Sequence, residues 1–77
     1  MMKYLTRTGD LGPELVAFTG SMGHDAMLAK LGWPRESVRS AGFIALTSTG
    51  LYCHGESSSL GIGSLASDSK LATAFFK

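Results

Sequence analysis

The sequence has almost no cysteine and no long apolar run, and these absences exclude several classes of protein. Cys53 is the only cysteine among 77 residues, so no disulfide can form within the chain. A structural zinc site needs about four ligands at suitable spacing, and no such grouping of Cys, His, Asp or Glu occurs. No apolar run approaches the roughly 18 to 20 residues of a membrane span, and residues 1–12 lack the apolar stretch of a signal peptide. We therefore expect a cytoplasmic protein that binds neither metal nor cofactor nor membrane.

Charged residues are also scarce. They make up 17% of the chain, they are scattered singly, and the formal net charge is +1. Proteins that hold nucleic acid rely on several Lys and Arg side chains acting together on phosphates. We therefore expect no nucleic-acid partner, unless assembly of several chains brings Arg7, Lys30, Arg35 and Arg39 to one surface.

Apolar residues, in contrast, are plentiful for a chain of this size. They account for 44% of the sequence, and the mean hydropathy is +0.15. A chain of this length buries roughly 60–65% of the surface that its unfolded form exposes, so its single core is small. Part of the apolar material must then lie outside that core. A self-associating surface explains this, and we expect a homodimer or higher oligomer, with another protein chain as a second partner.

The first half of the chain predicts two strands and a helix. Weak alternation over residues 3–8 and strand-forming residues over 14–19 predict two strands, joined by the Gly/Pro turn 9–13. The glycine-rich segment 20–23 then breaks the chain. Residues 24–31 carry an apolar stripe at helical spacing and are followed by glycine, which predicts a short helix.

The second half predicts a hairpin and a second helix. Residues 36–47 read as a strand, residues 48–50 as a three-residue connection with glycine last, and Leu51–Glu56 as the returning strand. Residues 57–64 fit either a further strand or a loop. Ser67 or Asp68 is expected to cap a final helix that ends near Phe76.

Together these elements predict a single domain over residues 1–77 of the α+β class. Its core is a small antiparallel sheet of three to five strands, in the order strand, strand, helix, strand, strand, optional strand, helix. We expect the two short helices to pack on one face of the sheet. The other face would then be the natural place for a contact between subunits.

The segment Leu51–Gly61, LYCHGESSSLG, gathers the residue types that often carry chemistry. Successive side chains of a strand point to opposite faces, so Cys53 and His54 cannot form a nucleophile and base pair there. His54 and Glu56 share a face with Tyr52. Two interpretations remain open for these three residues, a catalytic pair or the polar outer face of a sheet that takes part in self-association.

The serines that follow do not complete a known catalytic motif. Residues 55–59 read GESSS, and a nucleophile elbow requires glycine where Ser59 stands. The glycine segment 20–23 precedes a helix but lacks the lysine of a phosphate-binding loop, and Asp25 would repel an anion. We therefore assign no catalytic and no metal-binding residue.

Our leading hypothesis is a small interaction module or accessory subunit that acts by binding protein. Trp33 stands between a helix stop and a proline, where a large ring either closes the core or anchors an interface. The candidate interface residues are Trp33, Tyr52, His54, Phe75 and Phe76. The alternative is a small enzyme or ligand-binding protein with a site built from His54, Glu56 and His24, with Cys53 as a further candidate, between subunits.

Overall fold

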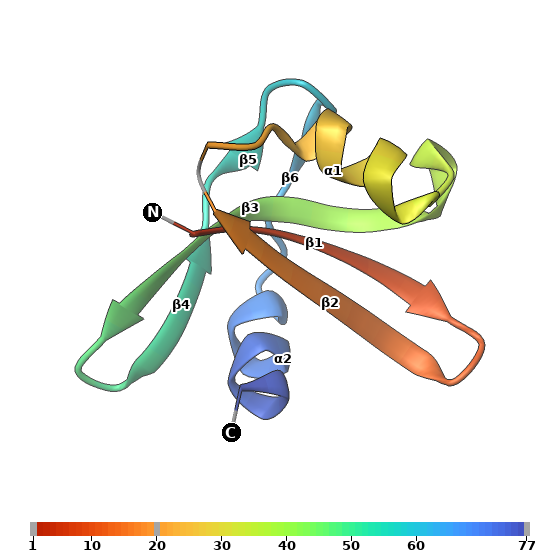
Figure 1. The fold of residues 1–77 in the computed structure, drawn as a ribbon. Coiled ribbons are helices and arrows are strands. Elements are labelled where there is room, and N and C mark those ends of the chain that lie inside the picture. The colour runs from red at the N-terminus through yellow and green to blue at the C-terminus, as the bar shows by residue number, and fades with distance from the viewer. Residues whose placement is uncertain (1, 20, 77) are drawn as a thin grey trace.

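Four strands form one antiparallel sheet in the computed structural model, which describes residues 2–19 and 21–76. The strands are β1 (Met2–Gly9), β2 (Gly12–Thr19), β3 (Val38–Thr47) and β4 (Gly50–His54). Their order across the sheet is β2-β1-β3-β4, so β1 and β3 lie inside and β2 and β4 form the edges. Figure 1 shows the β1–β2 and β3–β4 hairpins leaving the centre of the sheet in different directions.

Five further elements lie within the described residues, and the helices among them confirm the α+β class. They are α1 (His24–Leu31), the 3-10 helix η1 (Arg35–Ser37), β5 (Glu56–Ser57), β6 (Ile62–Gly63) and α2 (Asp68–Phe75). The first helix has the predicted bounds, and Gly32 ends it in the left-handed conformation. Gly20, where the predicted break begins, lies outside the described residues. In residues 2–19 and 21–76, no helix has the length and apolar character needed to cross a bilayer.

Both hairpins turn more tightly than the sequence predicts. Gly9 pairs with Gly12, and Thr47 pairs with Gly50, so each turn has two residues. Gly50 has a φ of +131° and belongs to β4, where we expected it to be the last residue of a three-residue loop. The ladders therefore run up to the pairs Gly9–Gly12 and Thr47–Gly50.

The returning strand is shorter than the predicted Leu51–Glu56. β4 ends at His54 because Gly55 has a φ of +77°, which turns the chain out of the sheet. Glu56 therefore starts the separate strand β5, which pairs with β6. The segment 57–64, left open between strand and loop, is a small hairpin with a turn between two short strands.

The two helices pack on opposite faces of the sheet, and the prediction of one shared face is wrong. Tyr4 and Leu5 are neighbours in the inner strand β1. Their side chains point to opposite faces of the sheet, and both are fully buried. On the Leu5 side lies Leu28 of α1; on the Tyr4 side lies Ala72 of α2. In Figure 1, α1 lies above the sheet and α2 below it. A strand that is apolar on both sides needs cover on both sides, and here each face of β1 is covered by one helix.

Candidate interaction surface

Cys53 and His54 lie on opposite faces of β4, as alternation along the strand predicts. Cys53 belongs to the buried cluster beneath α2, together with Tyr4, Ile44 and Ala72. His54 pairs with Phe43 of β3 and lies on the α1 side of the sheet. The sheet itself therefore separates the thiol from the imidazole.

A row of aromatic rings crosses the α1 side of the sheet. His24 is buried, and its Nε2 lies 3.0 Å from the carbonyl oxygen of Gly42. Phe43 lies between the two histidines, with its ring centre 5.9 Å from that of His24 and 6.0 Å from that of His54. Tyr52 stacks on His54 at 5.5 Å and is 55% exposed. The two imidazoles therefore do not meet, and the row ends in an exposed phenol.

The other residues of the alternative enzyme site are not assembled. Gly55 turns the chain between His54 and Glu56, so these two side chains do not share a strand face. Glu56 is exposed. Among the described residues, no three His, Cys, Asp or Glu side chains gather closely enough to hold a metal ion.

Trp33 closes the core at the side of β1. Its ring packs against the buried cluster on the α1 side of the sheet, and the guanidinium of Arg7 lies 4.3 Å from the ring centre. Arg7 also donates a hydrogen bond from Nε to Oε2 of Glu14, at 2.6 Å. This position fits the first of the two roles considered for Trp33, because the indole is partly buried between core and guanidinium.

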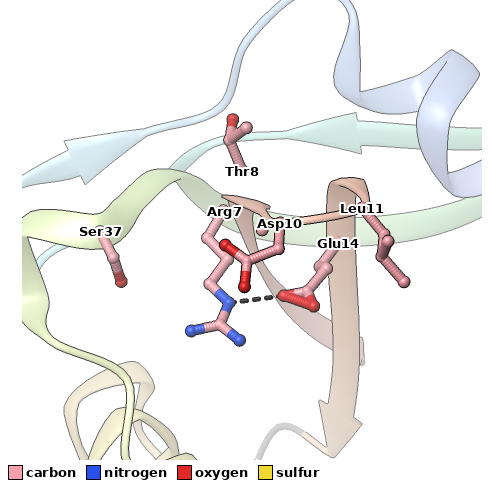
Figure 2. A pocket seen from close by; sticks show the side chains of 7 residues that line it. Arg7, Thr8, Asp10, Leu11, Glu14 and Ser37 are labelled. Atoms are coloured by element: carbon pink, nitrogen blue, oxygen red, sulfur yellow. Dashed lines mark hydrogen bonds and ion pairs between the residues drawn. The ribbon is translucent and has the colours of Figure 1, made fainter.

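A polar hollow of about 410 Å³ opens beside this ion pair, at the tip of the β1–β2 hairpin. Figure 2 shows the carboxylate of Asp10 next to the contact between Arg7 and Glu14. Two carboxylates and one guanidinium leave a negative balance, which disfavours an anion, and the paired arginine disfavours a cation. The hollow therefore does not define a ligand class.

A buried polar cluster lies beneath α2 on the opposite face. The Tyr4 hydroxyl donates to Oδ2 of Asp68, and the backbone N–H of Leu65 donates to the same oxygen at 2.8 Å. Burial, followed by the hydrogen bond to Asp68, raises the pKa of the Tyr4 phenol. Burial and the same carboxylate raise the pKa of the Cys53 thiol, so the thiolate is disfavoured. These groups tie α2 to the sheet and are protected from solvent.

The structure does not bring the five candidate interface residues into one patch. Tyr52 and His54 lie on the α1 side of β4, and Trp33 follows α1 near β1. Phe75 and Phe76 stand at the end of α2, on the other side of the sheet, and are 49% and 54% exposed. Their roles in an interface stay predictions.

The edge of β4 is covered by α2. Cys53 points its backbone N–H away from β3, and the hydroxyl oxygen of Ser69 accepts it at 2.8 Å. The helix leans toward this edge, so that a Cβ added at Gly50 would lie 3.9 Å from the Thr73 hydroxyl oxygen. This five-residue edge is therefore short and partly satisfied, in the manner by which proteins protect an edge strand.

The edge of β2 is open. β2 has eight residues, and its ladder with β1 begins at the pair Gly9 and Gly12. In an antiparallel ladder, hydrogen-bonded and non-bonded pairs alternate, so Leu15 and Ala17 direct their N–H and C=O groups away from β1. No described residue contacts these groups through a hydrogen bond. Among the described residues no strand pairs with β2 on the side away from β1 (Figure 1).

The sequence does not predict that β2 is an open edge strand, because its place in the sheet depends on pairing between distant segments. Only the pairing of β1 with β3 makes β2 an outer strand. One residue gave a local signal: Pro13 has no N–H to donate, and within sheets such a residue occurs at edges and strand ends.

Comparison with known proteins adds no assignment, since no family model matches the chain and no curated protein or solved structure matches it.

Proposed function

We propose that this chain is a protein-binding module whose binding element is the open edge of β2. The observation that carries this proposal is the unpaired backbone of Leu15 and Ala17 along an eight-residue edge strand. An extended segment of a partner can add to such an edge as a further strand, with main-chain hydrogen bonds supplying affinity. At β4, in contrast, Ser69 caps the outward N–H of Cys53, and this difference supports a function for the uncapped edge of β2.

A hollow beside the edge supports the same function. It has a volume of about 320 Å³ and is lined by Pro13, Arg39, Ser67, Lys70, Leu71 and Ala74. Pro13 is the second residue of the edge strand and Lys70, Leu71 and Ala74 belong to α2, so the hollow lies on the α2 side of that strand. In strand addition, hollows next to the edge receive alternate side chains of the added strand and supply specificity. Arg39 and Lys70 would favour an acidic side chain there.

The test is peptide binding to the isotope-labelled protein. Peptides selected from a random library should shift the amide resonances of Leu15, Ala17 and Thr19 and slow their hydrogen exchange. Replacing Ala17 by proline removes an outward N–H without removing a hydrogen bond to β1, and should abolish binding. Tyr52→Ala is the matched control, because it truncates an exposed side chain on the opposite edge strand.

The competing outcome is equally specific. If selected peptides bind Ala17→Pro as well as the original chain and lose binding in Tyr52→Ala, the exposed aromatic row is the binding surface and the β2 proposal is wrong. The shift map on the unmodified protein decides the question even if Ala17→Pro does not fold.

The expectations about location in the cell, catalysis and nucleic-acid binding are part of the same proposal. We propose that the protein acts in the cytoplasm, because its single thiol is free and buried. We also propose a role without catalysis, and the separation of His24, His54 and Cys53 supports it. Nucleic acid stays an unfavoured partner: of the four basic residues considered, Arg7 is paired with Glu14, and Arg35 donates to the carbonyl of Leu60.

A further inference from the structure

We infer that the partner of the β2 edge is β2 of a second copy of this chain, paired antiparallel about a two-fold axis at Val16. In this register Leu15 stands opposite the partner subunit's Ala17. The inference rests on the proposed function, since it names the occupant of the same edge. It joins the two four-stranded sheets into one continuous sheet.

In this register, each outward hydrogen-bonding group of one β2 edge faces a matching group on the β2 edge of the second copy. Leu15 and Ala17 each offer one N–H and one C=O, so each such pair exchanges two bonds. Pro13 stands opposite Thr19 of the other copy. Pro13 offers only a carbonyl, and Thr19 offers only its N–H, because the Thr19 carbonyl already accepts the N–H of Met22 at 3.3 Å. The pairing therefore forms about six backbone bonds and leaves no outward group of these residues without a partner.

Neighbouring registers lack this match. With the axis at Leu15, Pro13 would face Ala17, whose carbonyl would then find no donor. With the axis at Ala17, the N–H of Leu15 would face the Thr19 carbonyl that is already occupied. With the axis at Glu14, two carboxylates would stand directly opposite each other, which destabilises a strand pair.

The side chains agree with the same register. Val16 is half-buried and would face its own copy at a non-bonded position, where β-branched residues pack well. Glu14 would face Phe18 of the other copy, which keeps the two carboxylates apart.

Disulfide cross-linking tests the register on the full chain. At a non-bonded antiparallel pair the Cα atoms lie about 4.5 Å apart, which a disulfide can bridge. Val16→Cys should therefore form a covalent dimer on mild oxidation. Glu14→Cys is the matched control, because residue 14 of one copy lies about 14 Å from residue 14 of the other. The unmodified chain, whose Cys53 is buried, should stay uncross-linked.

The mass in solution completes the test. Sedimentation at high micromolar concentration should give twice the 8.1 kDa of the chain, and Ala17→Pro should halve that value. A monomer in the unmodified protein, or cross-linking of Glu14→Cys in place of Val16→Cys, overturns the inference. If the chain is monomeric yet selected peptides map to Leu15 and Ala17, self-pairing is wrong while edge binding stands. If peptides map elsewhere and Val16→Cys does not cross-link, both proposals fall.

Discussion

The hydroxyl of Tyr4 donates a hydrogen bond to the carboxylate of Asp68, 64 positions later in the chain, and neither side chain is exposed to solvent. The bond joins β1, an inner strand of the sheet, to the first turn of α2. One oxygen of Asp68 receives Tyr4 and the N–H of Leu65, while the other, Oδ1, has no partner among the described residues. The position of α2 on the sheet therefore depends on this contact.

Removing the Tyr4 hydroxyl should destabilise the fold. Tyr4→Phe keeps the ring in place but leaves the buried Asp68 with one donor fewer, and we expect the free energy of unfolding to fall by about 2 to 3 kcal/mol. Urea denaturation followed by circular dichroism measures the change. Asp68→Asn in a double-mutant cycle is the control, and additive effects of the two changes would show that the side chains are not coupled.

Stability should decline in alkaline solution. The pKa values of Cys53 and Tyr4 are raised in the folded state above ordinary values of about 9 and 10. Above those values the unfolded chain loses protons that the folded chain keeps, so unfolding is favoured as pH rises, by about tenfold in the unfolding constant per pH unit and group. The stabilisation is fully present below pH 8. Urea denaturation at several pH values from 8 to 11 measures the free energy of unfolding as a function of pH. In Cys53→Ala this free energy should fall less steeply between pH 9 and 10, because one of the two titrating groups is removed.

A side chain at Gly42 should not be tolerated. A Cβ there would lie 2.5 Å from the backbone oxygen of His54 and 3.3 Å from the Tyr4 ring. We expect Gly42→Ala to lower the free energy of unfolding by about 1 to 3 kcal/mol, since the backbone of β4 must shift. Gly63→Ala is the control, because its nearest contacts are 3.6 Å and 3.7 Å away. Equal melting temperatures of the two variants would contradict the close approach.

The single tryptophan should report the loss of Arg7. The guanidinium covers one part of the Trp33 ring, and no other indole contributes to the fluorescence. In Arg7→Ala the emission should move to longer wavelength as water reaches the ring, with a loss of about 1 kcal/mol in stability. Arg35→Ala, which leaves this contact intact, serves for comparison. An unchanged emission maximum would show that Arg7 does not cover the indole.

Local elements could be predicted from the sequence, whereas their placement in space could not. The stripe over residues 24–31, followed by Gly32, identifies α1 to the residue because both signals are local. The alternation that separates Cys53 from His54 is also local, and it is confirmed. The faces on which the helices pack depend on β1 lying inside the sheet. That in turn depends on its pairing with β3, which joins residues between Met2↔Ile44 and Arg7↔Val38, far apart in the chain.

The candidate site shows the same division. The sequence identified residues whose side chains attract attention, such as Tyr52 and His54. The edge proposed here works through backbone groups of Leu15 and Ala17, whose side chains are ordinary. Such a site becomes visible only when the neighbours of a strand are known, because any residue except proline carries the same N–H and C=O.

The long span between Tyr4 and Asp68 also has a consequence for synthesis on the ribosome. The β1–β2 hairpin emerges early, but the helix that covers its Tyr4 side emerges tens of residues later. Until then one apolar side of the nascent sheet faces water beside an unpaired strand. During this interval the nascent chain is most prone to aggregate. A chaperone that covers the β1–β2 hairpin would act at this stage of synthesis.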